Sequence, residues 1–136
     1  MTDSNIPEYV RCILYNRNGE ILLVFTEKLG IYTFPGGKIN PGEDAENAVR
    51  REVKEETNLD IENLKLLYQQ TSYFEHFQQY WKGHVFIGDA DFDKIKLNEP
   101  DKISSVKIIH ISDFRNIPEQ KSCPNIRFYI KEYLDK

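Results

Sequence analysis

Residues 34–59 read FPGGKINPGEDAENAVRREVKEETNL, a turn-rich run followed by a helical one. The run over 34–42 holds three glycines and two prolines, a composition that excludes a helix or a central strand. The pattern then changes, because Asp44 offers an N-cap oxygen and Asn58 stands where a left-handed cap residue is expected. The segment therefore predicts a loop that leads into one long helix over 44–57.

One side of this predicted helix combines apolar and acidic residues. Its apolar members are Ala45, Ala48, Val49 and Val53. Glu52, Glu55 and Glu56 follow on the same side, and their i, i+3, i+4 spacing brings the Cβ atoms to about 5–6 Å from one another. The cations Arg50 and Lys54 are expected on the opposite side. Two interpretations remain open on this geometry: a solvated acidic surface, or a site for a hard cation such as Mg²⁺.

The spacing of these acids resembles a known family signature. Gly37 is followed after five residues by Glu43 and, after seven more, by REVKEETNL at 51–59. This arrangement resembles the Nudix box, Gly-x5-Glu-x7-Arg-Glu-U-x-Glu-Glu-x-Gly-U, in which U is a bulky aliphatic residue. One position departs, because Asn58 replaces a glycine, and asparagine tolerates the same left-handed backbone. The run at 34–38 also resembles the entry to the box in MutT-like members.

The resemblance implies an α/β protein, a Nudix-type α/β/α sandwich with a mixed sheet. It also implies that Glu52, Glu55 and Glu56 bind Mg²⁺ or Mn²⁺, with the main-chain carbonyl of Gly36 or Gly37 completing the ligand set. The implied activity is metal-dependent cleavage of a diphosphate linkage in a nucleotide-like substrate. A bound cation offsets phosphate charge and acidifies a coordinated water.

The resemblance further assigns Glu43 and Arg51 to an ion pair that holds the loop against the helix. Two residues are candidates for the base that takes the proton of the attacking water. Glu56 is one, and Glu99 in the later loop is the other, with an exposed loop carboxylate as the alternative for Glu99. The implied catalytic set is Glu43, Arg51, Glu52, Glu55, Glu56 and Glu99.

The rest of the chain predicts strands around this helix. Strands are expected over 9–15, 21–25, 64–73, 79–88 and 106–111, and an amphipathic helix over 126–134. An Asn-Gly pair at Asn18 and Gly19 predicts a hairpin between the first two strands. Strands on both sides of one long helix indicate an α/β layered domain.

Composition limits the remaining classes of protein. With 136 residues and a net charge of −4, we expect one domain over residues 1–136 and no nucleic-acid partner, since such surfaces are usually basic. Cys12 and Cys123 are too few for a disulfide framework and are expected to be buried or idle thiols. The polar residues 1–5 do not resemble a secretory leader, and no run approaches the roughly 20 apolar residues that cross a bilayer. We expect a cytoplasmic protein that is a monomer or a homodimer.

The C-terminal part favours a nucleoside triphosphate as substrate. The run CPNI at 123–126 resembles the Pro-x-Asn region that opens the last helix of MutT-like enzymes, where the asparagine reads a purine edge. Asn125 is the matching residue here, and capping of the helix is its alternative role. The expected reaction converts a nucleoside triphosphate, oxidised purine nucleotides included, to the monophosphate and pyrophosphate.

Other side chains are candidate substrate contacts. Arg11 and Lys38 could each meet phosphate, with an ion pair or a solvent-facing position as the alternative. Phe74, Tyr80 and Trp81 could stack on a base, with burial in the core as the alternative. The three histidines do not have metal-ligand spacing, and structural roles are expected for them.

Other substrates and one other class of function stay open. ADP-ribose, nucleotide sugars and dinucleoside polyphosphates share the same linkage. The proline typical of ADP-ribose hydrolases is replaced in its region by Phe74, and the NADH-specific segment Ser-Gln-Pro-Trp-Pro-Phe-Pro does not occur. A non-catalytic nucleotide-sensing module is the alternative class, although such modules typically lose box acids that this chain keeps. Release of phosphate or pyrophosphate would separate an enzyme from a sensor.

Overall fold

A tight hairpin near the N-terminus forms the centre of the fold in the computed structural model, which describes residues 6–75, 77–97 and 105–135. Strands β1 (Glu8–Tyr15) and β2 (Glu20–Thr26) flank the turn. The Asn16 N–H donates to the Glu20 carbonyl over 3.0 Å. Gly19 takes a φ of +76°, a conformation that glycine adopts at little cost. The predicted hairpin is confirmed.

The described strands form a seven-stranded mixed sheet in the order β3-β2-β1-β6-β5, to which β4 adds by pairing with β1 and β7 by pairing with β2. The other strands are β3 (Ile31–Thr33), β4 (Gly36–Lys38), β5 (Glu62–Phe74), β6 (Gln79–Asp89) and β7 (Ser105–His110). The sheet is mixed because β1 runs parallel to β6 and the other paired strands are antiparallel. The predicted strands are thus present, each within two residues of its expected bounds.

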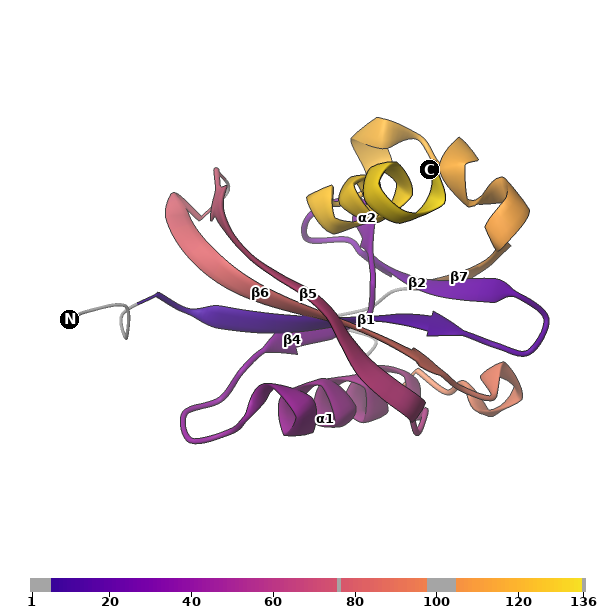
Figure 1. Ribbon diagram of the computed structural model, residues 1–136, viewed down its shortest axis with the longest axis horizontal. Helices are drawn as coiled ribbons and strands as arrows, with labels where there is room; N and C mark the ends of the chain where they lie inside the picture. Colours follow the sequence, from indigo (N-terminus) through magenta and orange to yellow (C-terminus); the bar gives the residue numbers. More distant parts are fainter. Residues whose placement is uncertain (1–5, 76, 98–104, 136) are drawn as a thin grey trace.

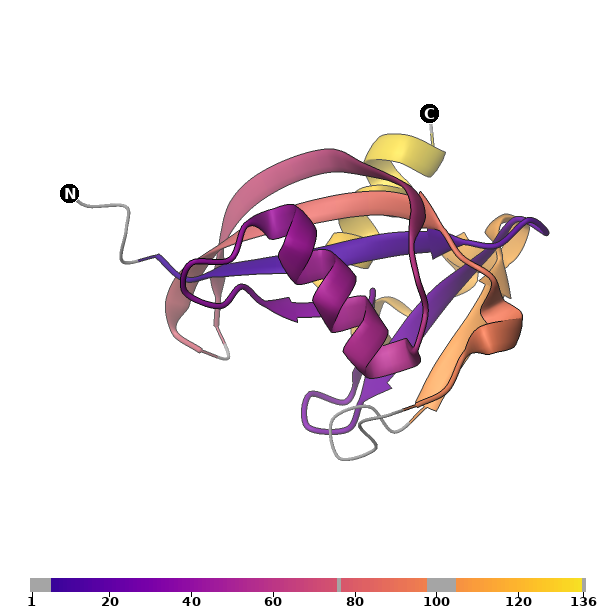
Figure 2. The same ribbon diagram turned by 90° about the horizontal axis from the view of Figure 1, so that it is seen from below.

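Helices cover both faces of this sheet (Figures 1 and 2). Helix α1 (Ala45–Thr57) lies on one face, and α2 (Pro124–Tyr129) lies on the other. The remaining helical segments are η2 (Phe92–Lys94), η3 (Ile111–Asn116), η4 (Glu119–Lys121) and η5 (Ile130–Leu134). The predicted α/β/α sandwich with a mixed sheet is therefore confirmed. Within the described ranges, none of the helices has the length and apolar character that crossing a bilayer requires.

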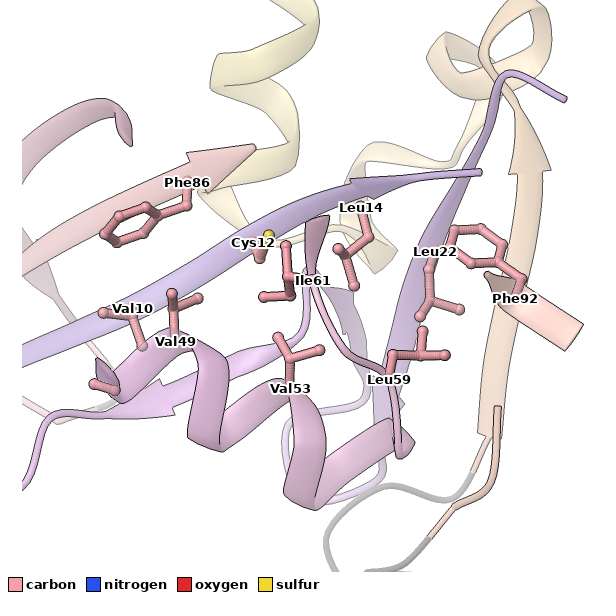
Figure 3. Packing of buried hydrophobic residues seen from close by; sticks show 11 residues of the cluster. Val10, Cys12, Leu14, Leu22, Val49, Val53, Leu59, Ile61, Phe86 and Phe92 are labelled. Carbon is pink, nitrogen blue, oxygen red and sulfur yellow. The ribbon is translucent and has the colours of Figure 1, made fainter. Parts of the chain in front are cut away.

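Two hydrophobic clusters hold the layers together. The first packs Val49 and Val53 of α1 against Cys12 and other residues of the sheet (Figure 3). The second contains Ile13, whose side chain points to the opposite face because side chains alternate along a strand, and Cys123 at the start of α2. Both cysteines are free, and burial raises the pKa of each thiol. The prediction of buried thiols is confirmed.

Helix α1 begins and ends at the predicted residues. The Asp44 carboxylate accepts a hydrogen bond from the Asn47 N–H over 2.8 Å, which satisfies one of the N–H groups left open at a helix start. At the other end Asn58 adopts a left-handed φ of +69° and donates its N–H to the Lys54 carbonyl over 2.9 Å. The asparagine therefore performs the backbone role expected of the glycine that it replaces.

The turn-rich run before α1 contains no helix and no central strand, as expected, but residues 36–38 form a short strand with a single neighbour among the described strands, which was not among the predicted elements. Strand β4 pairs with β1 through the registers Arg11↔Gly36 and Tyr9↔Lys38. Glycine makes this approach possible, because Gly36 has a φ of +155° and a Cβ there would collide with the Val10 carbonyl oxygen. The three-residue strand β3, which pairs with β2, is likewise absent from the predicted elements.

The predicted C-terminal helix is present with a different start and a change of form. It begins at Pro124, where proline suits the first turn because that turn needs no N–H partner. After Tyr129 it continues as a wider π-type turn, in which the Asp135 N–H donates to the Ile130 carbonyl over 2.9 Å. The helix therefore covers 124–134.

Candidate active site

An ion pair joins the loop after β4 to helix α1. The Arg51 guanidinium donates from Nε to Glu43 Oε2 over 2.7 Å and from Nη2 to Glu43 Oε1 over 2.9 Å. Arg51 Nη2 also donates to the Lys38 carbonyl over 3.2 Å. The hydrogen bond from Arg51 and a second one from the Asn40 N–H lower the pKa of Glu43 to about 2, and the Glu43 carboxylate in turn raises the pKa of Arg51. The predicted pair is present and fastens the loop to the helix.

Arg51 also reaches two of the three clustered acids. Its Nη1 lies 3.1 Å from Glu52 Oε2 and 3.1 Å from Glu55 Oε1. Arg50 and Lys54 bind other partners, as expected: Arg50 pairs with Glu46 at 3.6 Å, and Lys54 pairs with Asp60 at 3.2 Å. The expectation that the neighbouring cations point away is therefore correct for these two, while Arg51 supplies a positive charge that the helical spacing did not assign to the cluster.

The three glutamates differ in how far they face water. Glu52 and Glu56 are buried, at 5% and 4% exposure, whereas the Glu55 side chain is 45% exposed. Strand β4 packs directly against the two buried carboxylates. The Gly36 N–H donates to Glu56 Oε1 over 3.1 Å, and Gly37 lies so near Glu52 that a Cβ added to it would be 2.5 Å from Glu52 Oε2. Burial of carboxylates is costly unless positive charge or hydrogen bonds compensate it. The site thus brings five predicted metal-site residues together at one place.

The donor set suits a hard divalent cation in composition. In ranges 6–75, 77–97 and 105–135, no three His, Cys, Asp or Glu side chains already surround a common point as metal ligands do. Glu52 and Glu55 nevertheless gather oxygens around one positive atom, Arg51 Nη1, and carboxylate oxygens are the ligands that Mg²⁺ prefers. In the structure, Glu55 Oε1 pairs with Arg51 and Glu56 Oε1 accepts from the Gly36 N–H. These glutamates are the side chains that would hold the ion.

A cleft of about 450 Å³ lies next to β4, within the size range of small-molecule sites. All four predicted substrate-binding residues line it: Arg11, Lys38, Phe74 and Asn125. The other lining residues are Tyr9, Leu29, Ile31, Thr33, Gly37, Glu75, Phe77, Trp81, Cys123 and Pro124. Gly37 connects the two places, because it lines the cleft and also abuts Glu52.

Asn125 contributes to this cleft through its amide. Its Nδ2 donates to the Tyr9 hydroxyl over 3.2 Å, and its Oδ1 accepts from the Tyr68 hydroxyl over 3.1 Å. The N-cap of α2 is Cys123, without a side-chain capping bond. The capping role considered for Asn125 is therefore wrong, since its amide links two tyrosines from β1 and β5.

The aromatic candidates separate into two groups. Phe74 and Trp81 line the cleft, and their ring centroids lie 5.7 Å and 6.2 Å from that of Tyr9. Tyr80 is exposed and packs instead on Tyr73, with centroids 5.1 Å apart. Alternation along β6 sends neighbouring residues to opposite faces, which explains the separation.

Tyr9 is a cleft residue that sequence reasoning missed. It shares a face of β1 with Arg11, whose guanidinium carbon lies 5.6 Å from the Tyr9 ring centroid and whose Nη1 donates to the Phe34 carbonyl over 3.3 Å. The i, i+2 spacing of an aromatic residue and a cation was the available signal. Thr33, on the unpredicted strand β3, was missed with that strand.

Glu99 and the histidines lie away from the acidic cluster or outside the described residues. Glu99 lies outside the described residues, so its role as a base stays a prediction. His84 bridges Glu8 and Gln69 at 2.7 and 2.9 Å, and His110 caps a short helix through the Ser112 N–H. His84 and His110 have the structural roles expected of them, and His76 lies outside the described residues.

The fold and the acidic helix define a class that known proteins share. A family described as NUDIX domain matches residues 6–128, and the chain belongs to the Nudix family. The structure superposes on the crystal structure of a MutT NUDIX hydrolase from Burkholderia pseudomallei with a TM-score of 0.81, at 22% sequence identity, over 95% of this chain and 98% of that one. The expected family and fold are confirmed.

Curated relatives carry two different substrate names. The NAD-capped RNA hydrolase NudC of Pseudomonas syringae pv. tomato is 31% identical over 124 residues, which cover 90% of this chain and 42% of the relative. The putative 8-oxo-dGTP diphosphatase YtkD of Bacillus subtilis is 46% identical over 66 residues, which cover 48% of this chain and 40% of the relative. The chain thus spans less than half the length of these relatives.

Proposed function

We propose that this chain hydrolyses a phosphoanhydride bond in a nucleotide, as a single domain over residues 1–136 that uses Mg²⁺ or Mn²⁺. The observation that carries the proposal is the contact of Gly37 with both Glu52 and the cleft, which places the acids next to a nucleotide-sized space. Relatives named as hydrolases of nucleotide substrates support the same chemistry. The box acids that sensing modules lose are all present in this chain.

The division of labour follows from the positions of the side chains. A divalent cation supplies charge neutralisation at the phosphates and acidifies a bound water. Glu52, Glu55 and Glu56 would hold that ion, and Arg51 fastens β4 and the loop after it to the helix through the Lys38 carbonyl and Glu43. Positioning and electrostatics then account for most of the acceleration.

The proton of the attacking water needs a carboxylate acceptor. Glu56 is the candidate within the described residues, because it is buried beside β4 and its Oε1 is oriented by the Gly36 N–H. Glu99 remains the second candidate. Water forms a bond to one phosphorus, the bond from that phosphorus to the bridging oxygen breaks, and the second phosphate departs with the electron pair.

The cleft supports a nucleoside triphosphate as the substrate. Phe74 and Trp81 offer aromatic faces for a base, and Arg11 and Lys38 offer positive charge for phosphates at the end nearest Gly37. The products are then a nucleoside monophosphate and pyrophosphate. The name of the Bacillus subtilis relative supports this substrate class, oxidised purine nucleotides included.

A dinucleotide diphosphate is the second candidate. Similarity to NudC extends over 90% of this chain, more than the similarity to YtkD, and the NudC relatives are named as hydrolases of NAD-capped RNA. The net charge of −4 favours a small-molecule nucleotide over a nucleic acid, because RNA-binding surfaces are generally basic.

The deciding experiment is a substrate panel with the products identified. The purified chain is incubated with Mg²⁺ and nucleoside triphosphates, ADP-ribose, nucleotide sugars, dinucleoside polyphosphates or NAD. Pyrophosphate plus monophosphate from a triphosphate is the expected result. Selective cleavage of a dinucleotide would replace the triphosphate assignment, and binding without turnover of any compound would favour a sensing module.

A further inference from the structure

Strand β5 forms one margin of the sheet over 13 residues (Figure 2). Among the described strands it pairs with β6 alone, so the hydrogen-bonding groups along its outer edge point away from the sheet. A strand edge of this kind is a template for another strand, because its open N–H and C=O groups can continue the ladder. The outer edge of β5 can therefore accept a further strand.

The usual protection of a sheet edge is confined to one end of β5. Natural edges are protected by charged side chains, by proline or by β-bulges. Here Glu62, Lys65 and a bulge after Leu66 lie in the first half of the strand. The run LLYQQTSYF at 66–74 contains no charged residue and no proline. Most of this edge is therefore open to pairing.

The bulge brings two exposed apolar side chains to one face of β5. Leu66 is 45% exposed and Tyr73 is 48% exposed. They are seven positions apart, a spacing that would turn them to opposite faces in a regular strand. Their partners on β6, Phe86 and Tyr80, are six positions apart, so the extra residue of the bulge returns both side chains to the same face. That face therefore carries one exposed apolar group on each side of Gln70.

We propose that the outer edge of β5 pairs antiparallel with β5 of a second copy of this chain, around a two-fold axis at Gln70. In this register Gln69 faces Thr71 of the second copy and, beyond the bulge, Leu66 faces Tyr73. The two-fold axis creates the apolar contact twice, because each copy supplies both of its members. Such cross-strand pairs stabilise a sheet, and the pairing removes all four apolar side chains from water.

The same register is complementary in charge. It places Lys65 opposite Phe74 of the second copy, and Glu75 is the next residue along. Lys65 and Phe74 share a face, because their β6 partners are an even number of positions apart. Lys65 and Glu75 are both exposed, and Glu75 lines the cleft, so each copy brings its lysine beside the cleft of the other. Two ion pairs and two apolar contacts favour a second copy over an unrelated strand.

The first test is the mass of the intact chain in solution. Sedimentation equilibrium without substrate should give twice the 16.1 kDa of one chain at high concentration, with dissociation on dilution. A monomer at every concentration up to about 100 µM would overturn the proposal. Because no nucleotide is present, this result does not depend on the proposed hydrolase activity.

A charge at Gln70 tests the position of the two-fold axis. At the axis this residue faces its own copy, so Gln70→Lys and Gln70→Glu each place two like charges opposite one another. Each variant should dimerise about tenfold more weakly than wild type, or worse. An equimolar mixture of the two should recover the wild-type association, because unlike charges then meet. Unchanged dimerisation of both variants, or a mixture no stronger than its components, would overturn the pairing at this residue.

The matched controls are Gln120→Lys and Gln120→Glu. Gln120 is exposed on η4, which contacts β3 at the other end of the strand order from β5. Both controls should dimerise as wild type does, and circular dichroism should show all four variants folded. Control variants that dissociate as the Gln70 variants do would refute the assignment to β5.

A charge exchange tests the contact between Lys65 and Glu75. Lys65→Glu and Glu75→Lys should each weaken the dimer about threefold, the effect of an exposed ion pair lost at two places. The double variant should restore the wild-type association, because it reverses both charges together. A double variant that dimerises no better than the single variants would overturn the proposed register.

Discussion

The main-chain N–H of Gly36 donates to the buried carboxylate of Glu56 over 3.1 Å. This bond fixes the last acid of the helix to a three-residue strand that is itself paired with β1. A carboxylate in this position has a defined orientation without a metal ion, because backbone and side chain restrain each other. The candidate catalytic acids are therefore positioned by the sheet as well as by the helix.

Replacing a clustered acid by its amide should remove activity without unfolding the chain. Glu55→Gln and Glu56→Gln, made singly, keep the side-chain shape, and the new Oε1 of Glu56→Gln can still accept from the Gly36 N–H. We expect kcat to fall by about 100-fold or more in each variant, because a metal ligand or base is lost. Steady-state kinetics and circular dichroism measure both effects. Glu46→Gln, on the exposed first turn of α1, is the control and should retain wild-type kcat. Near-wild-type turnover in both cluster variants would remove the metal assignment.

Chelation should abolish hydrolysis, and restoration should depend on the ion supplied. We expect EDTA to reduce turnover to background and excess Mg²⁺ or Mn²⁺ to restore it, because the oxygen ligands of the cluster match hard cations. Initial rates at increasing free metal concentration give the apparent affinity. Full activity in EDTA would contradict a metal-dependent reaction.

Lysine cannot replace Arg51 in its bidentate contact with Glu43. Arg51→Lys loses the planar fork that reaches Glu43, Glu52 and the Lys38 carbonyl together. The free energy of unfolding should decrease by about 1–3 kcal/mol, as for the loss of charged hydrogen bonds. Urea unfolding provides the measurement. Arg115→Lys, at the exposed pair with Asp135, should change stability by less than about 1 kcal/mol. Equal effects of the two substitutions would show that Arg51 is an ordinary surface arginine.

Acidification should weaken the contribution of Glu43 over a defined range of pH. Its pKa is lowered from 4.5 to about 2 in the folded chain, chiefly by the hydrogen bond from Arg51. A carboxyl whose pKa is lower in the folded state stabilises the fold above its unfolded pKa, and that contribution is lost as the pH falls through its folded pKa. The stability difference between wild type and Glu43→Gln should therefore be largest above pH 4.5 and should shrink toward pH 2. Urea unfolding of both proteins along a pH series gives this difference. A difference that stays constant across the range would refute the ion-pair origin.

Local signals made much of the fold predictable. The Asn-Gly pair specified the first hairpin, and Asp44 and Asn58 specified the ends of α1, because each of these depends on residues close in sequence. The Glu43–Arg51 pair was available from the resemblance to the Nudix box. These features place the acids on the helix and fasten the loop beside them.

Long-range register made the rest of the site unpredictable from the sequence. Asn125 meets Tyr9 across 116 positions of sequence, and that partner replaces the capping role that its place at the helix start suggested. Strand β4 forms because its backbone pairs with β1 beside Gly36. A strand of three residues is too short to show a hydrophobic periodicity that could predict it. The Arg51 guanidinium contacts Glu52 and Glu55 at the same time as Glu43, because it lies along the surface of the helix.

The chain contains one tryptophan, Trp81, and that indole stands on the wall of the cleft. Its emission, excited selectively over tyrosine, therefore reports on this one place in the molecule. A stacked base would quench it, which makes every titration readable without a dye. The protein thus carries its own optical probe of occupancy.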